Sequence, residues 1–368
     1  MNAQPVIENP SAVAPELVGR SAHLGAFMSR FETSSWGAPI VVSGATGMGK
    51  TTLLRAFEAV AREAGWRVIS ETPVKGLTER MSGTYLPALY ENLAESESGL
   101  FEKLPLAEQI TTIAEKLQAT ERGLLITIDR YEKFATSSVR ELLTACRAAA
   151  ERRLPVLVVI SGRVGEVREF AQPENGEEQG AEHLPVCTLT RPQTEHALKG
   201  AIQQRHGEGS DGGEDYLRSV CELTCEQLAS ATQATAGYPY MIGLVAERIA
   251  ESLMHHASRE YLPYECFERA LNAAHESLGL RVLDPLLEQM SAGDRAFVEA
   301  MAQDDGPSKM SDIATRLQKN AQYVGVYRNR LVESQIIRPA SYGKVTFAIE
   351  HLREHLRTAV SFGADNEF

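Results

Sequence analysis

The sequence predicts an α/β protein: a parallel sheet flanked by helices, then a helical region, then a small C-terminal module of helices and strands. Three observations predict this fold. Short apolar runs alternate with helical segments between residues 39 and 161, as in parallel sheets covered on both faces. Residues 192–286 have a helical pattern. Three short helical stretches and two strand-like runs then follow.

The first part of the chain supplies the sheet. The strands that we expect are 39–43, 66–70, 123–129, 155–161 and 185–189. The helices that we expect beside them are 51–64, 84–119 with a break near Pro105, and 137–153. Residues 162–184 are polar and acidic, so we expect a surface loop there.

The second part of the chain is helical and ends in a different pattern. A Gly/Glu/Asp stretch at 207–215 interrupts the helices as a flexible loop. The last part combines expected helices at 291–302, 311–318 and 321–333 with strands at 335–338 and 344–349, which the turn 339–343 joins. These shifts predict four parts: an N-terminal arm (1–15), an α/β domain (16–191), a helical domain (192–285) and a winged-helix domain (286–368).

Composition limits the classes of function. The 368 residues are 43% hydrophobic and carry a formal net charge of −12, which excludes a basic coat over the whole surface but allows a local basic patch. The apolar runs are far shorter than the roughly 20 residues that cross a bilayer, and no secretion signal precedes them. The five cysteines form no CxxC pair, which indicates reduced thiols. We therefore expect a cytoplasmic protein without a membrane segment.

A phosphate-binding loop follows the first expected strand. Its eight residues match the pattern G-x-x-x-x-G-K-[ST] between a strand and a helix: Gly44, Ala45, Thr46, Gly47, Met48, Gly49, Lys50 and Thr51, with Thr52 next. Glycines let several backbone N–H groups turn toward one phosphate, and the helix N-terminus adds its positive end. Lys50 is expected to contact the β- and γ-phosphates of ATP, and the Thr51 hydroxyl to bind Mg²⁺.

A carboxylate ends the apolar strand expected at 123–129. The run 123–129 finishes with Asp129, at the carboxyl edge where ligands gather in open α/β sheets. We expect Asp129 to hold the Mg²⁺ through its water shell, together with Thr51. The alternative is an ordinary aspartate at the end of a strand.

These motifs and two flanking ones resemble a known family. Val18, Gly19 and Arg20 precede the phosphate loop, and Gly237-Tyr238-Pro239 lies in the helical part. Over roughly residues 16–358 the chain resembles the AAA+ ATPases related to origin-recognition and replication-loader proteins, and the neighbouring STAND signalling ATPases. It looks most like bacterial origin-recognition-like ATP-binding proteins. The resemblance implies that the α/β domain is an AAA+-like P-loop NTPase sheet and that the helical domain is its lid.

The resemblance also implies roles for single residues. Val18, Gly19 and Arg20 would lie against the adenine and ribose, although Arg20 can also be a solvated residue at a helix start. Arg163 follows the strand 155–161 at a position that senses the γ-phosphate, or it belongs to a plain loop. Pro239 would pack on the nucleotide, or it simply starts a helix.

Two departures from the family weaken hydrolysis. The family places a glutamate directly after the strand aspartate to activate water, but here that residue is Arg130. Glu132 is the nearest carboxylate and a weak catalytic candidate beside Lys50 and Asp129. The lid also carries Gly-Tyr-Pro where origin-recognition ATPases have an arginine. We therefore expect a slow ATPase whose nucleotide acts as a conformational or assembly switch, with self-association in the ATP state.

The C-terminal helices predict contact with duplex DNA. Residues 306–346 contain seven Lys or Arg against two Asp or Glu, a local charge of +5 in an acidic chain. Helices 311–318 and 321–333 would form a helix-turn-helix, with the strand pair as a wing. Candidate contacts are Gln322, Tyr323 and Arg328 on the outer face, with Lys319 and Lys344 at phosphates.

A rival interpretation is a STAND-like signalling or defence ATPase. Its winged helix would pack on its own ATPase core or bind a protein partner in place of DNA. The Gly-Tyr-Pro lid and the net charge of −12 favour this alternative, whereas the absence of a C-terminal repeat array counts against it. A DNA-transposition or phage-defence ATPase would share the same chemistry.

Overall fold

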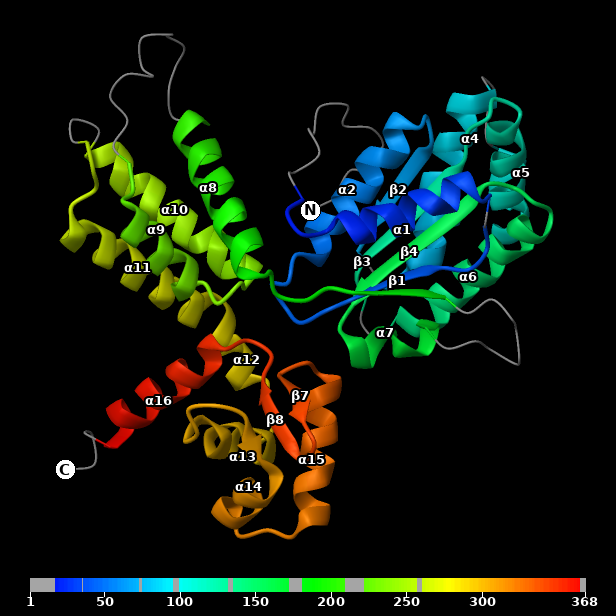
Figure 1. Cartoon of the computed structure of the whole chain (residues 1–368). Helices are drawn as coiled ribbons and strands as arrows, with labels where there is room; N and C mark the ends of the chain where they lie inside the picture. The colour runs from blue at the N-terminus through cyan, green and yellow to red at the C-terminus, as the bar shows by residue number, and fades with distance from the viewer. Residues whose placement is uncertain are drawn as a thin grey trace. The chain divides into compact units, whose positions relative to one another are not determined.

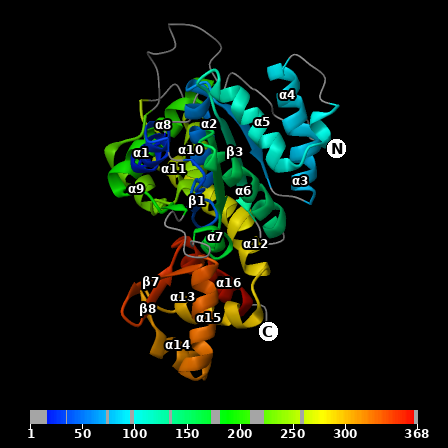
Figure 2. The same ribbon diagram turned by 90° about the vertical axis from the view of Figure 1, so that its right-hand side faces the viewer.

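The computed structural model describes residues 17–34, 36–72, 75–94, 99–131, 135–171, 181–208, 222–256 and 260–364. The chain divides into two compact units. The first consists of Met1–Gly44 and Gly49–Val186, and the second of Ala45–Met48 and Cys187–Phe368. Figures 1 and 2 show the elements of each unit from two sides.

The first unit is built on a five-stranded parallel sheet, as the sequence predicts. Its strands are β1 (Ile40–Ser43), β2 (Arg67–Glu71), β3 (Leu124–Tyr131), β4 (Val156–Gly162) and β5 (Glu182–Pro185). Their order across the sheet is β2-β3-β4-β1-β5, with every neighbouring pair parallel. The strand that separates β1 from β3 is thus β4, which brings its own carboxyl end between the phosphate loop and Asp129.

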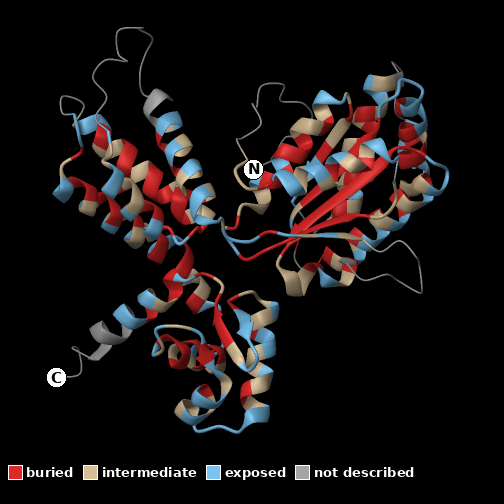
Figure 3. Cartoon of the chain, viewed as in Figure 1, coloured by how far each residue is buried: buried red, intermediate tan, exposed pale blue. Residues whose placement is uncertain are grey.

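Helices cover both faces of this sheet. They are α1 (Ser21–Glu32), α2 (Lys50–Glu63), α3 (Leu77–Arg80), α4 (Leu86–Ala94), α5 (Leu106–Gln118), α6 (Thr136–Glu151) and α7 (Val164–Ala171), with a π-helical turn at Met81–Tyr85 and a 3₁₀ turn at Phe101–Lys103. Phe27 of α1 stacks on Phe57 of α2 with ring centres 4.4 Å apart. The other face packs its alternate strand residues against α5 and α6. The three inner strands β3, β4 and β1 are therefore almost entirely buried, as Figure 3 shows.

Two expectations for the end of the first unit are wrong. The segment 162–184 is not a plain loop, because it contains α7 and β5. The last strand is Glu182–Pro185, not 185–189. Val167 and Phe170 of α7 are buried, three residues apart on one helical face, but the acidic residues around them hide this short pattern. Strand β5 alternates between half-buried and exposed residues at the sheet edge, so it lacks the apolar run that marks β3 and β4.

The second unit begins with a bundle of helices. They are α8 (Arg191–Glu208), α9 (Cys225–Ala234), α10 (Pro239–His255), α11 (Tyr264–Leu278) and α12 (Asp284–Glu288), with a π-helical turn at Gly279–Leu283. Helix α9 starts with a capping box, in which Thr224 and Gln227 bond each other's backbone N–H groups. None of the described helices of the chain is long and apolar enough to cross a membrane.

The C-terminal part of this unit has the order helix, strand, helix, helix, strand, strand, helix. These elements are α13 (Ala292–Ala302), β6 (Ser308–Lys309), α14 (Met310–Leu317), α15 (Ala321–Glu333), β7 (Ile337–Ser341), β8 (Lys344–Phe347) and α16 (His351–Ala364). The three strands form an antiparallel sheet in the order β6-β8-β7. The hairpin turn between β7 and β8 is shorter than the expected 339–343, because β7 continues through Pro339 to Ser341.

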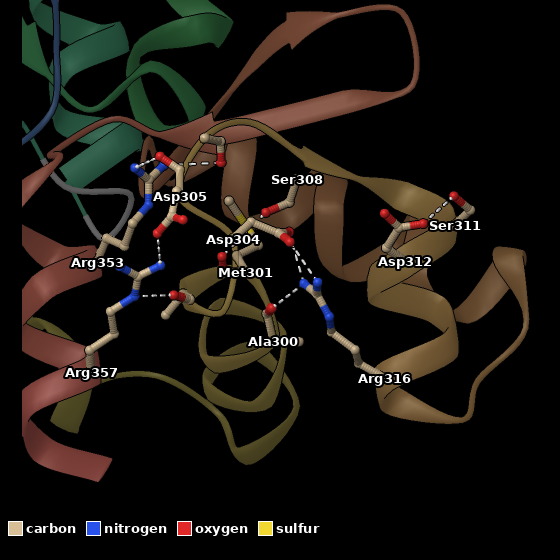
Figure 4. A network of polar contacts seen from close by, with 12 residues as sticks. Ala300, Met301, Asp304, Asp305, Ser308, Ser311, Asp312, Arg316, Arg353 and Arg357 are labelled. Carbon is tan, nitrogen blue, oxygen red and sulfur yellow. Dashed lines mark hydrogen bonds and ion pairs between the residues drawn. The ribbon is translucent and has the colours of Figure 1, made fainter. Parts of the chain in front are cut away.

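Arginines join the helices of this C-terminal module (Figure 4). Arg316 of α14 holds both carboxylate oxygens of Asp304 and the backbone carbonyl of Ala300. Its hydrogen bonds are the main cause that lowers the pKa of the Asp304 carboxyl. Arg357 of α16 likewise donates to the Ala302 carbonyl and to Asp305. The loop after α13 is therefore pinned from two helices, which gives the small module a defined shape.

Candidate functional site

The phosphate loop leaves β1 and enters α2 at a left-handed glycine. Gly49 is the N-cap of α2 with φ of 89°, and a glycine provides no side chain to cap the helix. The N-terminus of α2 carries the positive end of the helix dipole, which favours a bound anion. The Lys50 ammonium donates to the Gly44 carbonyl at 2.8 Å, so the side chain folds back along the loop. Gly44 is in turn held to β4, because its N–H donates to the Gly162 carbonyl at 3.3 Å.

The Lys50 ammonium is buried among both signs of charge. Burial lowers its pKa from the ordinary 10.5 to about 8. The carboxylates of Asp129 and Glu166 act in the opposite direction, and the guanidinium groups of Arg163 and Arg130 lower the pKa further. A cation with so little solvation gains strongly from an added anion.

Two hydroxyl groups orient the Asp129 carboxylate at the end of β3. The Thr51 hydroxyl donates to Oδ2 at 2.7 Å. The Ser161 hydroxyl, fully buried in β4, donates to Oδ1. The Asp129 side chain keeps about 15% exposure, so one side of the carboxylate is open. The structure therefore brings together Lys50, Thr51 and Asp129.

This donor set fits a magnesium–phosphate group. A hydroxyl and a carboxylate are the hard oxygen ligands that Mg²⁺ takes from proteins, directly or through water. The buried Lys50 ammonium and the uncapped first turn of α2 supply positive charge for phosphate oxygens. Thr51 and Asp129 would hold the metal, and Lys50 with the loop amides would hold the phosphates.

A buried carboxylate that the sequence analysis did not identify, that of Glu58, links α2 to β3. Glu58 lies on the inner face of α2 and is 6% exposed. Its carboxylate accepts a 2.6 Å hydrogen bond from the hydroxyl of Thr127, two residues before Asp129. Arg62 is 3.4 Å from the same carboxylate. A glutamate among the apolar positions Leu54, Phe57 and Ala61 was the available signal.

Two tyrosines hold the tip of the phosphate loop, a role that the sequence analysis gave to neither, although Tyr238 belongs to the Gly-Tyr-Pro motif. Within the second unit, the Tyr238 hydroxyl donates to the Thr46 carbonyl at 2.8 Å, and the Tyr240 N–H donates to the Gly47 carbonyl at 3.1 Å. Tyr238 is 1% exposed. Gly47 has φ of 76°, and a Cβ on it would be 2.2 Å from the Tyr238 hydroxyl oxygen. The loop can approach Tyr238 this closely because Gly47 has no side chain.

The residues to which the family resemblance gives a role lie at the start of α1, at the start of α10 and directly after β4. Val18 and Gly19 lie in the turn before α1, and Arg20 is its N-cap and only 7% exposed, so it is not a solvated residue. Pro239 is the first residue of α10, a position that suits proline, and Arg163 is ion-paired with Glu166. Glu132 lies outside the described residues. Contact of any of these residues with a nucleotide remains a prediction.

The cations of the C-terminal module fall into two groups. Arg316 and Arg330 are engaged inside the module, by Asp304 and Asp294 respectively. The remaining five form no ion pair among the described residues: Lys309, Lys319, Arg328, Arg338 and Lys344. Asp294 and Asp304 precede residue 306, so the +5 balance of residues 306–346 overstates the charge that the module presents.

The proposed DNA-contact residues differ in exposure. Gln322 and Lys319 are exposed, whereas Tyr323, Arg328 and Lys344 are half-buried. The Tyr323 ring packs 4.6 Å from that of Tyr327, and the Lys319 ammonium lies 5.4 Å from the Tyr323 ring centre. Arg328 donates to the amide oxygen of Asn329. Val326 on α15 and Tyr342 in the turn between β7 and β8 are two exposed large apolar residues of this module.

Two family models match the chain. Residues 16–159 match the AAA ATPase domain, and residues 281–356 match a domain of unknown function, DUF8462. The first match contains the phosphate loop, Asp129 and the strand β3, and the second runs from before α13 into the first part of α16. No curated protein sequence matches the chain.

The chain is similar to several solved structures at low sequence identity. The chain is similar to a structure of the Drosophila origin recognition complex bound to DNA, with 14% identity, a TM-score of 0.51, and coverage of 95% of this chain and 96% of that one. It also matches the Aeropyrum pernix ORC1 protein in complex with DNA at 18% identity and TM-score 0.40, covering 97% and 96% of the two chains. A structure of the replication initiator DnaA bound to AMPPCP and single-stranded DNA matches at 13% identity and a TM-score of 0.43. That match covers 97% of this chain and 98% of the other.

Proposed function

Residues 16–159 carry an AAA ATPase domain in a chain with the fold of an origin-recognition ATPase, and on this basis we propose that the chain binds ATP with Mg²⁺ as a switch. One observation carries the proposal: the Thr51 hydroxyl is 2.7 Å from the Asp129 carboxylate, beside the buried ammonium of Lys50. These three groups are the parts that a phosphate-loop ATPase needs.

Each residue of the site has a separate task. Lys50 neutralises the β- and γ-phosphate charge, and the α2 N-terminus binds phosphate oxygens. Thr51 and Asp129 hold the metal, and Ser161 keeps the Asp129 carboxylate in position. Bound Mg²⁺ supplies charge neutralisation between the β- and γ-phosphates.

We further propose that hydrolysis is slow. The residue after Asp129 is Arg130, which cannot accept a proton from water at neutral pH. General-base catalysis is typically worth roughly 10²–10⁴-fold, so its loss leaves a slow enzyme and a long-lived ATP state. Such a state suits assembly of several copies of the chain on ATP binding.

Calorimetric titration of ATP tests the nucleotide site. Wild type should bind ATP in the presence of Mg²⁺, and Lys50→Ala should lose most of the affinity. Lys199→Ala is the matched control, because Lys199 is a half-exposed lysine on α8 whose partner is Glu195. Equal ATP affinity in wild type and Lys50→Ala would overturn the proposal.

We propose duplex DNA as the partner of the C-terminal module. We assign residues 192–285 as a lid and 286–368 as a winged helix, since the helix–strand–helix–helix–strand–strand order suits that fold. Helix α15 would enter the major groove and the β7–β8 turn would follow the backbone. The five cations without an ion pair support this assignment.

A second candidate function is a signalling switch without DNA. The observation that favours it lies in the second unit, where His351 of α16 bonds the Ala234 carbonyl at 2.8 Å and its ring lies 6.1 Å from that of Tyr238. The C-terminal module thereby touches the same tyrosine that holds Thr46. In this candidate, nucleotide would release the module for a protein partner.

DNA titration of the full chain separates the two candidates. It is performed at two salt concentrations, with and without a non-hydrolysable ATP analogue. The DNA proposal expects binding that weakens steeply with salt and changes with the analogue. Absence of binding at low salt in both nucleotide states would leave the signalling switch as the better candidate.

A further inference from the structure

Arg130 has a backbone conformation that is unusual for its residue type. Its φ is 58°, in the left-handed region that side chains other than glycine rarely occupy. The residue lies within β3, where the register with β4 shifts between Ile128 and Tyr131. Such strain persists when the surrounding structure holds it, and it is concentrated at functional sites.

The Ser161 hydroxyl bonds both the bent backbone at Arg130 and the carboxylate of Asp129. The Arg130 N–H donates to the Ser161 hydroxyl oxygen at 3.1 Å, and the same hydroxyl donates to the Asp129 carboxylate. Ser161 has no exposed surface. The bend and the carboxylate are therefore fixed by one buried side chain.

The bend places the Arg130 guanidinium beside the carboxylate. In a regular strand successive side chains point to opposite faces, so Arg130 would face away from Asp129. Instead, Nε of Arg130 is 3.8 Å from Oδ2 of Asp129, the oxygen that also accepts from Thr51. The Arg130 side chain remains 75% exposed, so this ion pair is weak and easily exchanged.

Arg130 is also the more available of the two arginines near Lys50. Arg163 directly follows Gly162, whose carbonyl accepts from the Gly44 N–H, and Arg130 lies beside the Asp129 oxygen that accepts from Thr51. Arg163 is ion-paired with Glu166, with two of its nitrogens on one carboxylate oxygen. Among the described residues, the only ion pair of Arg130 is its 3.8 Å contact with Asp129.

We propose that Arg130 exchanges Asp129 for the γ-phosphate when Mg²⁺ and ATP bind, and thereby makes the site prefer ATP to ADP. This inference rests on the proposed nucleotide site. A divalent cation held by Asp129 repels the guanidinium, and the γ-phosphate offers it a two-oxygen acceptor. With ADP no such acceptor is present, and Arg130 stays on Asp129 in competition with the metal.

Separate affinities for ATP and ADP, measured by calorimetry with Mg²⁺ on the full chain, test the inference. Arg130→Ala should reduce the ratio of ATP to ADP affinity about tenfold or more, because a hydrogen bond between charged groups is lost. ADP affinity should stay the same or rise slightly, because Arg130 no longer competes with the metal for Asp129. Arg130→Gly should give the same ratio, and glycine suits the left-handed backbone, so this variant protects the test against misfolding. Arg168→Ala, which removes an exposed arginine of α7, is the control.

The outcomes separate this inference from the function on which it rests. An unchanged ratio in both Arg130→Ala and Arg130→Gly, with ATP binding still lost in Lys50→Ala, would refute the role of Arg130 and leave the nucleotide site intact. Failure of wild type to bind either nucleotide would overturn both. A lower ratio in the two Arg130 variants and an unchanged ratio in Arg168→Ala would support the exchange of partners.

Discussion

The hydroxyl of Tyr238 donates a 2.8 Å hydrogen bond to the backbone carbonyl of Thr46, although 192 residues separate the two in the chain. Two residues after Tyr238, the backbone N–H of Tyr240 donates to the carbonyl of Gly47, the residue after Thr46. The start of α10 therefore holds the tip of the phosphate loop by its outward carbonyl groups. Both tyrosines bond carbonyl oxygens of the loop and none of its N–H groups, so they support the loop without competing with a phosphate for those donors.

Tyr238→Phe should weaken the second unit while keeping the ring. The variant removes one buried hydrogen bond and leaves the Thr46 carbonyl without its donor, which costs about 1 kcal/mol. Urea denaturation followed by circular dichroism measures the change. Tyr264→Phe is the control, because Tyr264 is 69% exposed and the change should be within about 0.5 kcal/mol. Equal losses in both variants would contradict the importance of the Tyr238 bond.

Two glycine-to-alanine changes should act in opposite directions. At Gly47 a methyl group would meet the Tyr238 hydroxyl, and φ is 76°, so Gly47→Ala should destabilise by about 1–3 kcal/mol. At Gly243, inside α10, no atom lies within 4 Å of the added carbon, so Gly243→Ala should stabilise by about 0.5–1 kcal/mol. Thermal melting of the two variants provides the comparison. A stable Gly47→Ala protein would show that the loop does not rest on Tyr238.

Stability should fall as the solution becomes acidic because of His351. Burial is the main cause that lowers its pKa below the ordinary 6.5, and the nearby charge of His275 acts in the same direction. Glu350 and Glu354 oppose the shift, as does the bond to Ala234. Protonation would also add an N–H at Nδ1, which is buried and has no hydrogen-bond partner.

The sign of this effect follows from proton binding. Between the lowered folded pKa and 6.5 the unfolded chain binds a proton that the folded chain does not, so stability rises with pH up to about 6.5. Below that pH it should fall by at most about 1.4 kcal/mol per pH unit. His351→Gln should flatten this slope in urea titrations from pH 5 to 7. His255→Gln, at an exposed histidine of α10, should keep it; an identical slope in wild type and His351→Gln would refute the assignment.

Two cations of α15 and its preceding turn should behave differently toward DNA. Lys319 is exposed and forms no ion pair among the described residues, so Lys319→Ala should weaken DNA binding and reduce the salt slope by about one unit. Arg330 bonds Asp294 and Ser291, so Arg330→Ala should cost about 1–2 kcal/mol of folding stability. Salt-dependent DNA titration and urea denaturation measure the two effects. A normal salt slope in Lys319→Ala would remove it from the interface.

Long apolar strands and local motifs were predictable from the sequence. Strands β3 and β4 are continuous apolar runs, and the phosphate loop lies between β1 and α2 as its pattern requires. The short elements α7 and β5 were not predictable. Helix α7 has only eight residues in an acidic segment, and β5 is an edge strand, so both have little hydrophobic periodicity. Pairing of β5 with β1 is a long-range contact that only the assembled sheet defines.

The candidate site likewise contains residues that the sequence predicts and residues that it does not. Lys50, Thr51 and Asp129 belong to local patterns, and their proximity follows from strand order. Tyr238 and Glu58 were missed, since each acts through a partner distant in sequence. The left-handed backbone of Arg130 was also beyond prediction, because no residue type in Asp129-Arg130-Tyr131 signals a positive φ.

During synthesis, strand β1, which leads into the phosphate loop, can pair with its neighbouring strands only after they have been translated. In the described sheet β1 pairs with β4 and β5, both made long after Ser43 leaves the ribosome. Strands β2 and β3 emerge earlier but pair with each other and with β4, so they cannot shelter β1. The nascent chain therefore carries an apolar strand with two open edges until residues 156–185 are translated. A polypeptide that ends before Val156 would contain the phosphate loop and Asp129 but would lack β4 and β5, the two strands that pair with β1. We expect such a truncated chain to be bound by chaperones or degraded by proteases.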